Sequence, residues 1–120
     1  MGRTAAYWVI TAVVVGECAA GGTMDLFRLA PFYPMLLELG YPGYLSVILG
    51  IAKLAAAVVL LVPRLRRLKE WAYAGVMINM LGAAASWLAV RPSAGALVPP
   101  LSFAVLALLS WRLRPAGRRL

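Results

Sequence analysis

Residues 44–62, YLSVILGIAKLAAAVVLLV, decide the fold, because over this whole run they carry one charged side chain, Lys53. An α-helix rises roughly 1.5 Å per residue, so the run reaches about 28 Å, close to the thickness of the hydrocarbon core of a bilayer. A membrane-spanning β-strand would show alternating polarity over about ten residues, and this run does not alternate. The segment therefore predicts a transmembrane helix.

Three further apolar runs accompany this segment, at residues 7–24, 71–90 and 97–111. The runs at 7–24 and 71–90 are long enough to span, whereas the last is slightly short. The second and third spans, like the third and fourth, are joined by short connections that contain proline and charge, so consecutive helices should be antiparallel neighbours. We expect an all-α fold, a four-transmembrane-helix antiparallel bundle that forms one domain over residues 1–120.

The connection over residues 25–43 is longer and only half polar. Pro34 suits the first position of a helix and Gly40 the position just past a helix end, and aromatic residues lie around them. We expect a short interfacial helix in this first extracytoplasmic loop, lying on the membrane surface.

The composition supports a membrane protein and excludes several classes of enzyme. Hydrophobic residues make up 63% of the 120 residues, and the mean hydropathy is +0.86, whereas soluble domains are roughly half apolar. The single cysteine, Cys18, allows no intramolecular disulfide, and the lack of histidine removes histidine-ligated metals and histidine-based catalytic arrangements. We expect no metal site and no catalytic residue, and we favour a protein without independent catalytic activity.

The net charge of +8 has a topological explanation. With a cytoplasmic N-terminus, only Arg28 and Arg91 lie on the outer side. The basic residues on the inner side are then Arg3, Arg64, Arg66, Arg67, Lys69, Arg112, Arg114, Arg118 and Arg119. The positive-inside rule therefore predicts a multi-pass protein of the cell (inner) membrane with both termini in the cytoplasm, and no nucleic-acid partner is needed to explain the charge.

Ionisable side chains within a span are costly and usually functional, and here they are Glu17 and Lys53. Glu17 lies about 15 Å from the cytoplasmic start of its span and Lys53 about 14 Å from the cytoplasmic end of the next. The same count places Asn79 and Ser102 at a similar depth. We expect one polar residue from each helix to meet near the midplane.

Small residues flank these polar positions and favour close helix packing. We expect their helical faces to point inward. The residues are Gly21, Gly50, Ala57, Gly75 and Gly82, with Ser86 one further turn along from Gly82.

Two interpretations of the polar layer remain open. A Glu17 and Lys53 ion pair, with polar residues bonding across helices, could serve only to specify the packing. Alternatively, the layer is a pocket that binds or shuttles a ligand or proton. Asp25 lies two turns from Glu17 on the same face, and we expect it to pair with Arg28 rather than extend such a pocket.

Four motifs deserve comparison with known families. They are LGYPGYL at 39–45, ILGIAKL at 48–54, KEWAYAG at 69–75 and GAAAS at 82–86. Together they resemble the DoxX-like family of small four-helix membrane proteins. In relatives, a histidine often follows the serine that matches Ser86, but Trp87 stands here, so no role of that histidine is carried over. The resemblance implies the four-helix fold, and known relatives include subunits of quinone-linked oxidoreductases and membrane-protein assembly factors.

The resemblance and the polar layer together suggest a membrane subunit that binds a lipophilic ligand, with quinone as the candidate cofactor and a soluble oxidoreductase as the candidate partner. A homo-oligomer is left open. One alternative is a proton-coupled transporter resembling small multidrug exporters, which are also short tetraspans with a glutamate in the first span. Another is an assembly factor. The candidate ligand-binding or proton-handling residues are Glu17, Asp25, Lys53, Asn79, Ser86 and Ser102.

Overall fold

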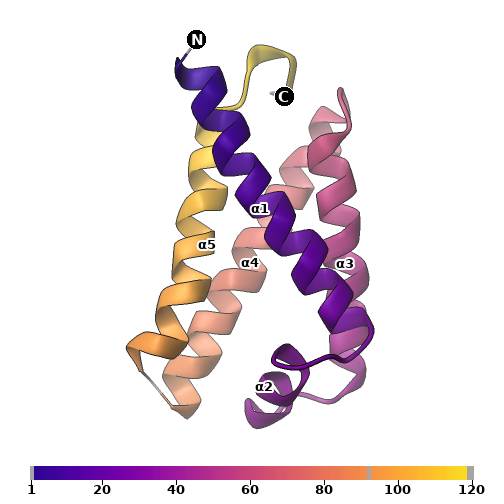
Figure 1. Ribbon diagram of the computed structural model, residues 1–120, viewed down its shortest axis with the longest axis vertical. Helices are drawn as coiled ribbons and strands as arrows, with labels where there is room; N and C mark the ends of the chain where they lie inside the picture. Colours follow the sequence, from indigo (N-terminus) through magenta and orange to yellow (C-terminus); the bar gives the residue numbers. More distant parts are fainter. Residues whose placement is uncertain (1, 92, 119–120) are drawn as a thin grey trace.

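The computed structural model describes residues 2–91 and 93–118, and within them the fold is an antiparallel bundle of long helices (Figure 1). Each of these helices is long and apolar enough to cross a membrane. The bundle confirms the predicted all-α fold. Its four long helices are α1 (Gly2–Leu26), α3 (Tyr44–Leu61), α4 (Arg66–Val90) and α5 (Ala94–Arg112).

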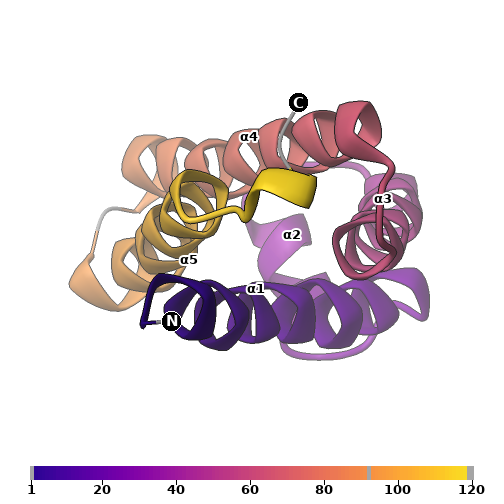
Figure 2. The same ribbon diagram turned by 90° about the horizontal axis from the view of Figure 1, so that it is seen from above.

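The four helices form a ring in which α1 packs against α3 and α5, and α4 packs against the same two helices (Figure 2). Helix α1 runs diagonally across the bundle, from beside α5 to beside α3 (Figure 1). Both ends of the described chain lie at one end of the bundle, which we call the terminal end. The opposite end, which holds the short helix α2 (Phe32–Glu38), is called the α2 end.

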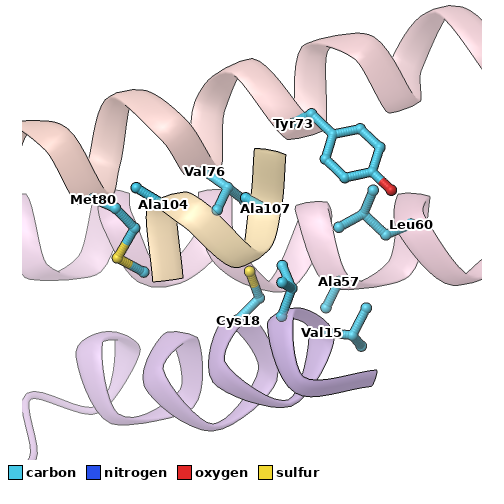
Figure 3. Packing of buried hydrophobic residues seen from close by; sticks show 10 residues of the cluster. Val15, Cys18, Ala57, Leu60, Tyr73, Val76, Met80, Ala104 and Ala107 are labelled. Atoms are coloured by element: carbon cyan, nitrogen blue, oxygen red, sulfur yellow. The ribbon is translucent and has the colours of Figure 1, made fainter. Parts of the chain in front are cut away.

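The core lies where all four helices meet (Figure 3). It contains several alanines, which let the helices approach closely. Large apolar side chains lie on the outer surface instead, including Trp71 at 75% exposure and Ile78 at 72%, as lipid contact requires. The core residues are Val14, Val15, Cys18, Ala57, Leu60, Tyr73, Val76, Met80, Ala104 and Ala107.

Glycine permits the close crossing of α1 and α3 near the α2 end. A Cβ atom on Gly50 would lie 2.5 Å from the Leu26 nitrogen and 2.7 Å from the Gly22 oxygen, both of which are backbone atoms. Gly21 is also buried, so the inward faces predicted for α1 and α3 are confirmed. The prediction is wrong for Gly75 and Gly82 of α4, which are exposed and would have no atom within 4 Å of an added Cβ.

A short helix was predicted where α2 lies, but α2 begins two residues earlier than predicted. Pro34 is the third residue of α2 rather than the first, a position that still falls in the first turn, where a missing N–H costs little. Gly40 has a φ of 92° and ends the helix as predicted: its N–H donates to the Leu37 oxygen, while the Tyr41 N–H donates to the Leu36 oxygen.

Seen from above, helix α2 lies within the outline of the ring, at the far end of the bundle from the termini (Figures 1 and 2). Glu38 forms an ion pair with Arg91 at 2.8 Å, and the Tyr41 hydroxyl hydrogen-bonds the Ser86 hydroxyl. These contacts join the segment to the far end of α4. The α2 end of the bundle is therefore covered by the chain itself.

Three of the long helices begin earlier than their predicted spans, and the first of them, α1, begins at Gly2 rather than at residue 7. Helix α4 begins at Arg66 rather than at residue 71, because residues 66–70 are mostly good helix formers. Helix α5 begins at Ala94 rather than at 97, because the Ser93 side chain accepts a hydrogen bond from the Ala96 N–H and caps it. The added turn gives α5 a length of about 28 Å, enough to span.

Candidate ligand-binding site

A cluster of three charged side chains lies between α1 and α3. The Lys53 ammonium of α3 is 3.3 Å from Glu17 Oε1 and 3.2 Å from Asp25 Oδ2, both on α1. The three side chains are 14%, 12% and 8% exposed, respectively. A Cβ on Gly21 would lie 2.8 Å from Glu17 Oε1 and 3.3 Å from Lys53 Nζ, so this glycine leaves the space in which the pair forms.

The structure confirms that Glu17 and Lys53 meet, and corrects the expectation for Asp25. Asp25 pairs with Lys53 and not with Arg28, whose backbone N–H donates to the Asp25 backbone oxygen. The reason is geometric: Arg28 has left the helix with a φ of 56° and is exposed, whereas the long Lys53 side chain reaches Asp25.

Phe32 of α2 completes the surroundings of Lys53. Its ring centroid lies 5.6 Å from the Lys53 nitrogen, within the range of a cation–π contact. The ammonium thus faces two carboxylates and one aromatic ring. No local sequence pattern predicts this contact, because the position of α2 over the bundle depends on the course of the 19-residue connection at 25–43.

One cavity of about 370 Å³ opens between α3 and α4, and we call it the lateral cavity. Its mouth includes the exposed side chains of Trp71 and Ile78, so it opens on the surface that faces lipid. Its inner wall carries Glu17, Lys53 and Asn79. Apart from these three residues and Cys18, the lining consists of aliphatic side chains together with Trp71, Gly75 and Met80. The shape suits an apolar body with one polar end.

A second cavity of about 510 Å³ lies toward the α2 end, between α1, α2, α4 and α5, and we call it the α2-end cavity. It shares Glu17, Lys53 and Asn79 with the lateral cavity. Pro99 and Pro100 of α5 also line it, and since proline has no N–H, two helical hydrogen bonds are missing in this turn.

Of the other predicted site residues, one lines the cavities and two do not. Asn79 lines both cavities beside Glu17 and Lys53, as the depth count predicted. Ser102 is exposed on the outer face of α5, so its predicted place in the layer is wrong; it lies two residues, about 200° of helical turn, from the buried Ala104. Ser86 bonds Tyr41 and the Gly82 oxygen and contributes to neither cavity.

A second polar group, absent from our predictions, lies nearer the terminal end. The buried Ser110 hydroxyl hydrogen-bonds Thr11 at 2.6 Å and Tyr73 at 2.7 Å, which joins α5 to α1 and α4. Each of these side chains is a common residue in a span, so its type alone carries no signal. The hydroxyls of this group are hydrogen-bonded to one another, and none of the three residues lines either cavity. The group therefore serves to hold the helices together.

These features define a small multi-pass membrane protein with a charged cluster between two apolar cavities. The chain belongs to the DoxX-like family, whose family model matches residues 9–110. No curated protein and no solved structure matches the chain. The family assignment agrees with the motif resemblance and with the fold, and it leaves the ligand to be argued from the site.

Proposed function

We propose that this protein binds a lipophilic ligand with a polar end, such as a quinone, which enters from the bilayer through the lateral cavity. The observation that carries the proposal is the cavity itself: an apolar opening between α3 and α4 that ends at Glu17, Lys53 and Asn79. A ligand dissolved in lipid would reach this mouth without crossing water. Its polar end would then meet the buried polar groups of the layer.

The polar groups suit the two redox forms of a quinone in different ways. The Asn79 amide can donate a hydrogen bond to a quinone carbonyl. Two donors of Lys53 already face Glu17 and Asp25, so its main task is to compensate charge. Glu17 Oε2 is buried and has no hydrogen-bond partner among the described residues, so it can accept a bond from the hydroxyl of a quinol.

A quinone role would require a partner. The chain has one cysteine and no histidine, so the usual protein ligands for a haem or an iron–sulfur cluster are lacking. Electrons would come from an oxidoreductase that docks at the membrane. In this proposal the protein lies in the cell membrane with its terminal end in the cytoplasm, where the basic residues of that end face the partner.

The proposal is tested by a thermal-shift titration of the purified protein with short-chain quinones. A ligand that binds the folded state raises the melting temperature increasingly with its concentration. We expect a shift in the wild type, a much smaller shift in Asn79→Leu and Glu17→Gln, and an unchanged shift in Ser102→Ala, the matched control on the outer face. A shift that survives Asn79→Leu and Glu17→Gln would mean nonspecific partition into the micelle. The absence of any shift in the wild type would refute quinone binding.

Proton-coupled transport is a second candidate, favoured by one observation. Glu17 lines both cavities, one toward the terminal half of the bundle and one toward the α2 end, as a carboxylate in an alternating-access carrier would. In proteoliposomes with an internal pH dye, a gradient of a lipophilic cation should then drive proton flux that Glu17→Gln abolishes. Flux that persists in Glu17→Gln would exclude this function.

A further inference from the structure

The larger of the two cavities, the α2-end cavity, has one short helix in its wall. Phe32 and Met35 of α2 line it, together with Pro31 just before that helix. Helix α2 has no buried residue and packs mainly against α1. A segment with so little buried surface opens more readily than a helix of the core.

Two exposed contacts join the α2 segment to the far side of this cavity, at the end of α4. Glu38 and Arg91, which form the ion pair, are 41% and 69% exposed, and the hydrogen bond between Tyr41 and Ser86 is also exposed. Such contacts contribute little to stability, because water competes for the same polar groups. They hold the segment in place and can break at a small cost.

The chain turns sharply on both sides of α2. Arg28, before the helix, has a φ of 56°, and Gly40, after it, has a φ of 92°. Hinges in proteins are a few loop or element-terminal residues that absorb large changes in φ and ψ. Both residues lie outside α1 and α3, so α2 can move as a unit between them while those two helices stay intact.

Phe32 links the position of α2 to the charged cluster. The Lys53 ammonium faces Glu17 and Asp25, and the Phe32 ring lies beside it at 5.6 Å. Because Glu17 and Asp25 both belong to α1, a movement of α2 would remove the ring and leave the two ion pairs in place. An ammonium has three donors, so Lys53 would then have one for an acceptor that enters the α2-end cavity.

We propose that α2 is a lid that opens the α2-end cavity to water on the side of the membrane opposite the termini. The structure shows this lid closed, with Phe32 beside Lys53. The lateral cavity opens toward lipid, and the two cavities meet at Glu17, Lys53 and Asn79. The lid therefore gives the same polar layer a second entrance, for a water-borne molecule with a hydrogen-bond acceptor such as a carbonyl oxygen. This inference does not depend on the lipophilic ligand being a quinone.

Cysteine labelling in nanodiscs tests the lid, because a charged thiol reagent then reaches both ends of the bundle from water. In a Cys18→Ser background, Ala83→Cys places a thiol in the α2-end cavity and Ala55→Cys places one in the lateral cavity. Ala83→Cys should react slowly in this parent. It should react about tenfold faster when Glu38→Gln and Tyr41→Phe are added, since two weak contacts together oppose opening by about that factor. Ala55→Cys should stay unreactive, because a charged reagent does not enter lipid.

The controls separate opening of the lid from general loosening. Tyr44→Phe removes an exposed hydroxyl at the start of α3 and should leave the rate at Ala83→Cys unchanged. Equal rates at Ala83→Cys with and without the two lid substitutions would overturn the proposal. So would a parent rate that matches that of Leu37→Cys, which lies on the exposed side of α2. A rise at Ala55→Cys as large as that at Ala83→Cys would mean that the whole bundle loosens, which also overturns the lid.

Discussion

At the scale of single residues, Lys53 is the group on which the charged cluster depends. Without it, two carboxylates from one helix would face an apolar interior with no positive charge between them. We predict that Lys53→Met lowers the free energy of unfolding by about 3 kcal/mol, the cost of breaking a buried ion pair. Glu17→Gln and Asp25→Asn should each cost less, because each keeps a one-to-one pair.

The check is a variant that combines Glu17→Gln, Asp25→Asn and Lys53→Met. Its thermal denaturation is compared with that of the single variants in one detergent and lipid mixture. Removing all three charges should recover part of the stability lost in Lys53→Met, because no uncompensated charge remains. If the three single effects simply add, the residues are not coupled.

Part of this site could be predicted from the sequence. The parts that could not be predicted depend on side-chain direction and on the path of the chain. Counting residues from the ends of the spans gives depth, and depth was enough to bring Glu17, Lys53 and Asn79 together. It does not give the direction in which a side chain points, so Ser102 was placed in the layer although it faces outward. The pairing of Asp25 required the path of the chain after α1, which no local pattern specifies.

At the scale of helices, the crossing of α1 and α3 depends on Gly50. An added methyl group would overlap the backbone of α1, which cannot rotate away as a side chain could. We predict that Gly50→Ala destabilises the protein by roughly 1–3 kcal/mol, as overpacking does. Gly82→Ala is the matched control: it is exposed in the middle of α4, so it should be neutral or slightly stabilising. Equal melting temperatures for the two variants would contradict this crossing.

Lys69 stabilises the end of α3, a role that the charge pattern does not predict. Lys69 was predicted as one of the basic residues at the cytoplasmic surface, but its side chain is buried and donates to the backbone oxygens of Val59, at 2.7 Å, and Val62. Arg118 donates to the Leu60 oxygen beside them. Together they satisfy carbonyls that the end of a helix leaves free.

We predict that Lys69→Met frees these carbonyls and costs about 1–3 kcal/mol. Hydrogen exchange should then be faster in the last turn of α3, while Arg67→Met, an exposed neighbour with the same change of charge, leaves exchange there unaltered. Faster exchange in both variants would point to net charge rather than capping.

At the scale of the whole molecule, both ends of the described chain lie at one end of the bundle, and the basic residues predict on which side of the membrane that end lies. We expect reporter fusions at the C-terminus to be active in the cytoplasm, and a cysteine introduced at Arg66 to be protected from an impermeant reagent added outside. The existence of four spans was predictable because each span depends on local composition. The two cavities were not, because each depends on how side chains from different helices pack together, which local composition does not specify.

A crystal structure grown in a lipid phase with a short-chain quinone would test the central claim most directly. We predict electron density for the quinone ring inside the lateral cavity, with one ring oxygen within hydrogen-bond distance of the Asn79 amide and near Glu17. A lateral cavity filled by a lipid acyl chain, with no ring at Asn79 under saturating quinone, would contradict the proposal that this layer is a ligand site.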